Sequence, residues 1–378
     1  MKTISWGRIV NEFFDGASNI TLDLAKQRLR EANLSFAELP ISQDSTILIV
    51  ELGGRILGPF SGINKRSVLW MPSWWNTSES WKEAIIRKEW NIGGERLWVA
   101  PEIQYCITDR FNPTLSYKLP AEMDPGEYHI TRPRASLINL EAKMKLKALH
   151  YSPPDQQISV GRKVEPAKNP LRNLYQRDLL MKGIQYSGYK HSIQLRIESP
   201  DPCLSEAWSI MQVRQGGISI LPTFGKPQIG WYYHPEPTSL IEFEKSPMLV
   251  HHCEQKLFKI GIHSTSLTGR AGYLHNADGT NPPYLIIRNY RVSPSSEYCE
   301  EPFTSPGENG YACHLYNSGN PKERFGEIEC HGNAMGGSSE EDTSSLTLET
   351  WFFEGNYMQL EMIAHQLLSY QPSTKTIK

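Results

Sequence analysis

The stretch FGEIECH, Phe325–His331, has the alternating pattern of a β-strand. Successive side chains on a strand point to opposite faces, so Glu327, Glu329 and His331 are predicted to share one face and the residues between them the other. Neighbours on one face lie about 6.6–6.8 Å apart along the strand. Such a row could supply an acid and a base or a set of metal ligands, although charged residues are also ordinary on the solvent face of an antiparallel strand.

Outward from this stretch, most of the chain from residue 45 onward reads as further strands. The apolar run 45–60 predicts either a strand buried on both faces or a hairpin that turns at Gly53–Gly54. Turns are also predicted at Gln215–Gly217, within a hairpin, and at Asp278–Gly279, between two strands. The polar, proline-rich segment 151–175 predicts a long loop or surface excursion.

The fold class follows from these strands. The chain has 378 residues with 26 Pro and 28 Gly, which favours turns and short strands over long helices. No period of 20–50 residues repeats, which excludes a propeller or solenoid. Two sheets that cover each other's apolar faces are the natural solution, so we predict a mainly β protein built as one large antiparallel β-sandwich.

Helices are expected mostly at the two ends of the chain. Thr21 can cap a helix whose apolar residues follow at helical spacing, and residues 1–40 are predicted to form an N-terminal helical cap. Residues 41–378 are predicted to form a single β-sandwich domain. It would close with a helix near the C-terminus, whose apolar positions are Met358, Met362, Leu367 and Leu368.

Composition excludes several classes of protein. The formal net charge of −2 argues against nucleic-acid binding, which needs clustered Lys and Arg. No run of about 18 apolar residues predicts a membrane span, and the first residues lack the pattern of a secretory signal. The six cysteines are scattered without a C-x-x-C pair, which indicates reduced thiols. We therefore expect a cytoplasmic protein that binds neither nucleic acid nor membrane; the sequence does not indicate its oligomeric state.

Several motifs together resemble the galactose-mutarotase-like supersandwich. They are ELGGRILGPF (51–60), WWN (74–76), GGERLWVAPE (93–102), LPT (221–223) and FGEIECH. The GGERLWVAPE segment is similar to that of a poorly characterised bacterial branch of this superfamily. The resemblance covers about residues 45–355 and implies a β-sandwich that binds a sugar in a cleft on one concave sheet.

The resemblance also implies a place for the catalytic base. In aldose 1-epimerases the base is a late glutamate on a strand, which corresponds by position to Glu327 or Glu329. The NHxYxN-type segment of those enzymes is missing, which is a departure from their pattern. Epimerisation at the anomeric carbon needs a base for the hydroxyl proton and an acid for the ring oxygen. The histidines that could be the acid are His331, His191, His263 and His314, and His331 is favoured by its place in the row.

The candidate substrate-binding residues can hold sugar hydroxyls through a polar group or stack on a sugar ring. They are Arg55, Trp75, Glu95, Arg96, Glu102, His191 and Arg270. Each has a structural alternative, such as an ion pair for the arginines or a core position for the tryptophan. Trp74 and Trp75 are adjacent, so in an extended segment at most one of them would lie in the core.

Cofactors are not expected. The row of Phe325–His331, together with His251–His252 or His314, could hold Ca²⁺, Mn²⁺ or Zn²⁺. No H-x-H or H-E-x-x-H motif supports a metal, so none is assigned. There is no P-loop, no G-x-G-x-x-G after a strand and no G-x-S-x-G elbow.

Three functions remain open from the sequence. The first is an isomerase that epimerises an aldose or sugar derivative with a Glu/His acid–base pair, similar to an aldose 1-epimerase. The second is a polysaccharide or oligosaccharide lyase, or a glycoside hydrolase, on the same scaffold. The third is a carbohydrate-binding protein without catalysis. In each case the expected partner is a small sugar or oligosaccharide.

Overall fold

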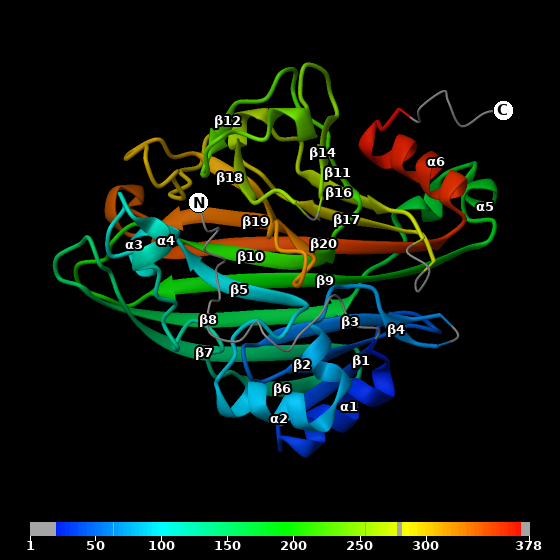
Figure 1. The fold of residues 1–378 in the computed structure, drawn as a ribbon, viewed down its shortest axis with the longest axis horizontal. Helices are drawn as coiled ribbons and strands as arrows, with labels where there is room; N and C mark the ends of the chain where they lie inside the picture. The colour runs from blue at the N-terminus through cyan, green and yellow to red at the C-terminus, as the bar shows by residue number, and fades with distance from the viewer. Residues whose placement is uncertain (1–19, 63, 254, 278–281, 372–378) are drawn as a thin grey trace.

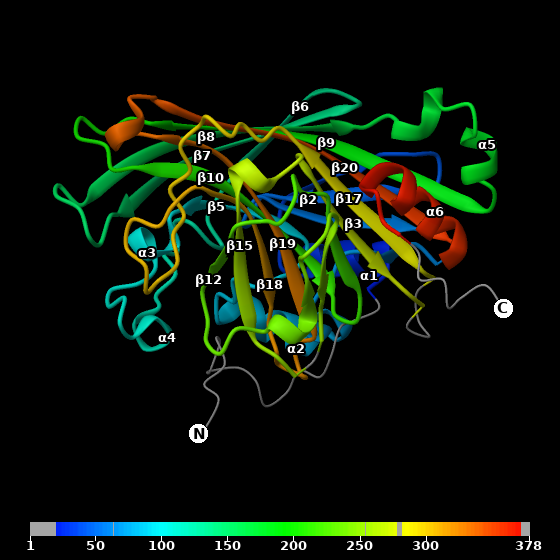
Figure 2. The same ribbon diagram turned by 90° about the horizontal axis from the view of Figure 1, so that it is seen from above.

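Two antiparallel sheets of ten strands each pack face to face (Figures 1 and 2). This computed structural model describes residues 20–62, 64–253, 255–277 and 282–371. The predicted mainly β sandwich is confirmed. The core between the sheets is apolar and continuous, as expected when each sheet can bury its apolar face only against the other.

The first sheet carries the site described below. In spatial order its strands are β1 (Phe36–Pro40), β2 (Thr46–Val50), β3 (Arg55–Ser61), β5 (Glu95–Ala100), β10 (Ser205–Arg214), β19 (Phe325–Met335), β18 (Tyr311–Asn317), β15 (Phe258–His263) and β12 (Ile229–Trp231), with β4 (Arg66–Ser67) paired to β3.

The second sheet contains the longest strands. In spatial order they are β13 (Ile241–Glu242), β14 (Met248–His251), β11 (Ile218–Leu221), β16 (Arg270–His275), β17 (Tyr284–Tyr290), β20 (Thr343–Gly355), β9 (Ile184–Ile197), β8 (Asp155–Pro166), β7 (Leu137–Lys147) and β6 (His129–Arg134). In β9, Ile193, Leu195 and Ile197 are buried while Gln194 and Arg196 are exposed, so one face packs and the other is solvated.

The prediction of a long loop over residues 151–175 is wrong for Asp155–Pro166, which form β8. This strand pairs with β7 and β9 along its length. Its inward positions include Gln156 and Arg162 as well as apolar residues, and both of these polar side chains are buried. Because polar residues occupy inward positions, the alternation of apolar and polar side chains is hidden in the sequence.

Of two predicted hairpins at glycine pairs, the structure contains one. The turn at Gly53–Gly54 joins β2 to β3 as a hairpin, one of the two alternatives considered. The hairpin predicted at Gln215–Gly217 is wrong, because β10 belongs to the first sheet and β11 to the second. Gly216 has a φ of +98°, which lets the chain bend from one sheet to the other. The turn predicted at Asp278–Gly279 lies outside the described residues, although β16 and β17 on either side of it do pair.

Helices lie at the ends and edges of the sandwich. They are α1 (Leu22–Glu31), α2 (Ser78–Ile86), α3 (Glu102–Tyr105), α4 (Pro113–Ser116), α5 (Arg177–Leu180) and α6 (Tyr357–Leu368). The helices α5 and α6 lie together at one end of the molecule, and α3 and α4 lie at the other (Figures 1 and 2). None of the described helices is long and apolar enough to cross a membrane.

The predicted terminal helices are present, but one of them buries an unexpected face. Thr21 Oγ1 accepts a hydrogen bond from the Leu24 amide at 3.3 Å and caps α1 as predicted. In α6 the buried side chains include Leu360 and Ile363, whereas Met358 and Met362 are exposed. The division of the chain near residue 40 stays a prediction: residues 1–19 are not described, and β1 already pairs with β2.

Trp74 and Trp75 are both buried, so the prediction that at most one lies in the core is wrong. They lie in a 3₁₀ helix, Ser73–Asn76, where adjacent side chains do not point in opposite directions. Their rings pack with Trp81 of α2. This aromatic cluster fixes α1 and α2 over the outer face of β2 and β3.

Candidate active site

The register of five strands gathers polar side chains on the outer face of the first sheet. Trp208 of β10 lies opposite both Trp98 of β5 and His331 of β19. Gln212, four residues further along β10, lies opposite Glu327. Because side chains alternate along each strand, the facing positions of β5, β10, β19, β18 and β15 all point to this one side.

These strands and the loops above them enclose a cavity of about 70 Å³. It is lined by Trp90, Asn91, Arg96, Trp98, Glu102, Tyr117, Trp208, Tyr233, Lys259, Tyr316, Glu323, Phe325, Glu327 and Glu329. Aromatic walls with a few charged groups between them are typical of a small-molecule site.

Glu327 is held in an ion pair. Arg96 Nη2 lies 2.8 Å from its Oε1, and Gln212 Nε2 donates to the same oxygen at 3.0 Å. The guanidinium carbon of Arg96 lies 5.2 Å from the ring centre of Trp90 and 4.5 Å from that of Trp98, so the cation is stacked on both rings. Two donors from neighbouring strands therefore hold the same oxygen of Glu327.

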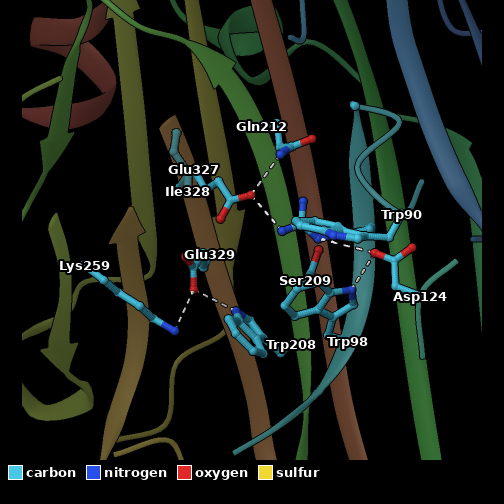
Figure 3. A network of polar contacts seen from close by, with 12 residues as sticks. Trp90, Trp98, Asp124, Trp208, Ser209, Gln212, Lys259, Glu327, Ile328 and Glu329 are labelled. Carbon is cyan, nitrogen blue, oxygen red and sulfur yellow. Dashed lines mark hydrogen bonds and ion pairs between the residues drawn. The ribbon is translucent and has the colours of Figure 1, made fainter. Parts of the chain in front are cut away.

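Glu329 lies in a different environment, two residues further along β19. The indole N–H of Trp208 donates to its Oε2 at 2.8 Å, and Lys259 Nζ lies 3.9 Å from the same oxygen. Figure 3 shows Glu327 directed toward Gln212, and Glu329 toward Lys259 and Trp208. Burial raises the pKa of Glu329 to about 8 even though Lys259 opposes the shift, so this carboxyl carries a proton at neutral pH.

Lys259 is already engaged by carboxylates. Its Nζ lies 2.7 Å from Glu102 Oε2 and 3.7 Å from Glu300 Oε1. Burial by itself would lower the pKa of Lys259, but Glu102, Glu329 and Glu300 outweigh it and keep the amine charged. Burial raises the pKa of Glu300 to about 7, again against the opposing effect of Lys259. Two cations and several carboxyls are therefore packed against aromatic rings in this cavity.

His331 lies behind the cavity wall and is not among the lining residues. Its ring stacks on Trp208, with ring centres 5.6 Å apart. Both of its nitrogens are hydrogen-bonded, Nδ1 to Glu206 at 2.7 Å and Nε2 to His314 Nδ1 at 2.9 Å. Burial holds the pKa values of His331 and His314 well below the ordinary value, so both imidazoles are neutral.

Within the described residues, His314, Glu329 and His331 form the group that comes closest to a metal site. Their nearest ligand atoms lie within 4.8 Å of one another. The facing nitrogens of the two histidines are hydrogen-bonded to each other, and Lys259 places a positive charge beside Glu329. The arrangement is therefore that of a hydrogen-bonded cluster, which would have to break a bond to accept a cation.

No protein-family model and no curated protein sequence matches the chain. Solved structures do. A galactose mutarotase-like protein from Lactobacillus casei ATCC 334 has a TM-score of 0.47 at 9% identity, covering 84% of this chain and 100% of that one. A putative aldose 1-epimerase from Escherichia coli K12 has a TM-score of 0.49 at 8% identity, covering 85% and 100%. A 4-alpha-glucanotransferase from Thermococcus litoralis has a TM-score of 0.34 at 8% identity, covering 88% and 41%.

The first two of these structures are proteins of the kind that the sequence motifs resemble. The chemistry of this chain rests on its own residues.

The structure brings together four of the predicted site residues at the cavity: Arg96, Glu102, Glu327 and Glu329. Arg55 lies next to it, fully buried, in an ion pair with Asp124 at 2.6 Å. Asp124 also accepts from Trp98 Nε1 at 2.8 Å, so Arg55 supports the wall of the cavity from behind.

The other predicted residues lie elsewhere. Glu95 and His191 are on the inner face, hydrogen-bonded to each other at 3.1 Å between the two sheets. Trp75 belongs to the aromatic cluster under α1 and α2, and its indole N–H donates to the Ile92 carbonyl. Arg270 lies on the second sheet, where it donates to the Leu367 carbonyl of α6. None of these four residues lines the cavity.

Lys259 and Trp208 were missed by the sequence reasoning. A signal for Lys259 was present, because a lysine in the apolar strand FKIGI must be either paired or functional. A larger hollow, of about 1130 Å³, lies on the outer face of the second sheet and is lined mainly by Ser, Thr and Asn side chains. The buried acid–base groups lie in the smaller cavity.

Proposed function

We propose that this protein binds a single neutral sugar ring in the cavity of the first sheet and interconverts its anomers. The observation that carries the proposal is the contrast between Glu327 and Glu329. They share one face of β19, yet Glu327 is ion-paired with Arg96 while burial raises the pKa of Glu329 to about 8. An ion-paired carboxylate beside a carboxyl with a raised pKa can serve as base and acid.

The reaction would proceed by two proton transfers. The Glu327 carboxylate takes the proton of the anomeric hydroxyl, and the Glu329 carboxylic acid gives its proton to the ring oxygen. The bond between C1 and the ring oxygen breaks as the C1 carbonyl forms. After rotation about C1–C2, the ring hydroxyl returns a proton to Glu329, Glu327 protonates the carbonyl oxygen, and the ring closes as the other anomer.

The walls favour a neutral sugar. Trp90, Trp98 and Trp208 offer apolar ring surface to the C–H faces of a pyranose. Both cations that line the cavity are already paired, Arg96 with Glu327 and Lys259 with Glu102. An anionic sugar would have to break one of these pairs, whereas a hydroxyl needs only a hydrogen bond.

Glycoside hydrolysis is the second candidate, because it also uses one protonated and one ionised carboxyl. The small volume of the cavity favours a single ring over an oligosaccharide. The sequence-based hypothesis of a Glu/His pair remains a prediction. We favour two glutamates because both nitrogens of His331 are engaged in hydrogen bonds behind the wall.

The test is to add the protein to freshly dissolved single anomers of neutral aldoses and follow the anomeric protons by NMR. We expect faster equilibration for at least one aldose. Release of new reducing ends from oligosaccharides without such acceleration would select the hydrolase. Calorimetric binding of a sugar without turnover of any kind would leave a binding protein and reject both reactions.

A further inference from the structure

Behind the cavity, four buried side chains form one continuous line of hydrogen bonds. Tyr232 Oη lies 2.8 Å from His314 Nε2, His314 Nδ1 lies 2.9 Å from His331 Nε2, and His331 Nδ1 lies 2.7 Å from Glu206 Oε1. Tyr232 is 3% exposed and the other three are fully buried. Each imidazole uses both nitrogens within the line, so all three bonds must run in the same direction.

The three hydrogen bonds can all donate toward Glu206 or all donate toward Tyr232. When Glu206 is ionised, Tyr232 donates to His314, His314 to His331, and His331 to the carboxylate. When Glu206 takes up a proton, it donates to His331 Nδ1, each ring donates through Nε2, and His314 donates to Tyr232 Oη. From the second arrangement, Glu206 passes its proton to His331 Nδ1, and each ring passes its Nε2 proton to the next acceptor. Tyr232 Oη takes the last of these protons as its own hydroxyl proton leaves for an acceptor outside the line, so one proton leaves at Tyr232 and Glu206 is ionised.

The tyrosine end lies beside the cavity. Lys259 Nζ is 4.8 Å from the Tyr232 ring centre, and the carboxyls of Glu102, Glu300 and Glu329 surround that lysine. Burial, and then the charges of these three carboxyls, raise the pKa of the Tyr232 hydroxyl well above its ordinary value. We infer that they are the acceptors for its proton.

The rings lie against the same wall. Trp208 stacks on His331 and donates its indole N–H to Glu329, whose oxygens come within 4.8 Å of the imidazole nitrogens.

The glutamate end of the line lies near Glu300, the same carboxyl that is 3.7 Å from Lys259 at the tyrosine end. Glu206 Oε2 accepts the Cys299 amide at 2.7 Å, and the Cys299 thiol, Glu300 and Tyr298 are the other titratable groups around it. Burial raises the pKa of Glu206 well above its ordinary value. Tyr298, which is itself buried, also lines the hollow on the second sheet, whereas Glu206 is fully buried and does not line it.

We propose that Glu206, His331, His314 and Tyr232 form a proton relay that links Glu206 to the cavity wall at Glu329. The four are positioning residues, since none of them lines the cavity. The relay itself follows from the hydrogen bonds; only the use of its proton by Glu329 rests on the proposed function.

The test uses the full chain labelled with ¹⁵N-histidine, with the ring tautomers followed by NMR from pH 5 to pH 10. We expect both rings to stay neutral and to change together from the Nε2–H to the Nδ1–H tautomer as pH rises. Glu206→Gln should abolish this joint change. Rings that change separately, become cationic, or keep one tautomer throughout would overturn the relay.

The link to the cavity is read from the indole N–H of Trp208, assigned with Trp208→Phe. In the native chain we expect its chemical shift to titrate with Glu329 and to respond again when the tautomers change. Tyr232→Phe keeps Glu206 and both histidines, so it should retain the joint tautomer change and lose that second response. A response that survives in Tyr232→Phe would overturn the link. None of these readouts needs catalytic activity, so a failure of the proposed function remains distinguishable.

Discussion

Arg288 of β17 reaches across the sandwich to Glu95 of β5, with Nη2 2.9 Å from Oε1 and both side chains fully buried. Ser209 donates to the same glutamate oxygen at 2.6 Å, and His191 Nδ1 lies 3.1 Å from it. Burial alone would raise the pKa of Glu95, but Arg288 and His191 outweigh it and hold that pKa well below the ordinary value. An ionised pair thus joins the two sheets in the middle of an apolar core.

Removing one partner of this pair should destabilise the fold strongly. Arg288→Met leaves the Glu95 carboxylate buried without its cation, and we expect a loss of about 3–5 kcal/mol in the free energy of unfolding. The double variant Arg288→Met/Glu95→Gln should recover part of that loss. Urea unfolding of Arg288→Met, Glu95→Gln and the double variant measures the coupling; simple additivity would show that the pair is not coupled.

The acid–base assignment predicts slow reactions but different pH profiles in two variants of β19. Glu327→Gln and Glu329→Gln should each slow anomer interconversion about 10²–10⁴-fold, the usual contribution of one proton-transfer group. In the native enzyme the rate should fall as pH rises through about 8, where Glu329 loses its proton. That alkaline limb should be absent from the residual activity of Glu329→Gln.

The matched control is Glu141→Gln, an exposed glutamate of β7 on the second sheet. It should leave both rate and pH profile unchanged. Small and equal effects of all three substitutions on the rate would show that Glu327 and Glu329 are not the base and the acid.

Stability should depend on pH through Glu329. Its pKa is raised from 4.5 to about 8 in the fold, so the native state holds a proton that the unfolded state releases. This contribution is complete below pH 4.5 and is lost as pH rises through 8, with a size on the order of a few kcal/mol. The urea concentration at the unfolding midpoint should change less between pH 5 and pH 8.5 in Glu329→Gln than in the native chain. An equal change of the midpoint with pH in both proteins would contradict the raised pKa of Glu329.

The paired cations predict a preference for neutral ligands. By titration calorimetry, a neutral aldose should bind more tightly than its uronate. Glu102→Gln removes the carboxylate 2.7 Å from Lys259 and should improve uronate binding about tenfold, because the lysine can then meet the ligand carboxylate. Tighter uronate binding by the native chain would show that the pairs open on binding.

The sequence predicted the sandwich because its strands alternate and its turns are marked by Gly and Pro. It located the acidic row for the same reason: period two alone places Glu327 and Glu329 on one face. The same rule could have separated Glu95 from Arg96. These neighbours on β5 must point to opposite faces, and only Arg96 faces the cavity.

Long-range pairing could not be read in this way. Whether His331 faces a ligand or a carboxylate depends on Glu206, which lies 125 positions away in the chain. The strand β8 was hidden because its inward Arg162 is buried, where it donates to the Gly54 carbonyl at 2.6 Å and to His191 at 3.0 Å. In a sequence, an arginine predicts an exposed position, because most arginines are exposed and the acceptors of a buried one cannot be seen there.

The bend at Gln215–Gly217 has a consequence for how the protein can be made. The chain passes from one sheet to the other there and again at many later points, so neither sheet is an uninterrupted piece of sequence. Separate fragments would expose a complete apolar face, and pairing such distant strands slows folding. Attempts to produce either half of the sandwich alone should yield aggregates, and complementary halves should restore a folded molecule only when they are synthesised together.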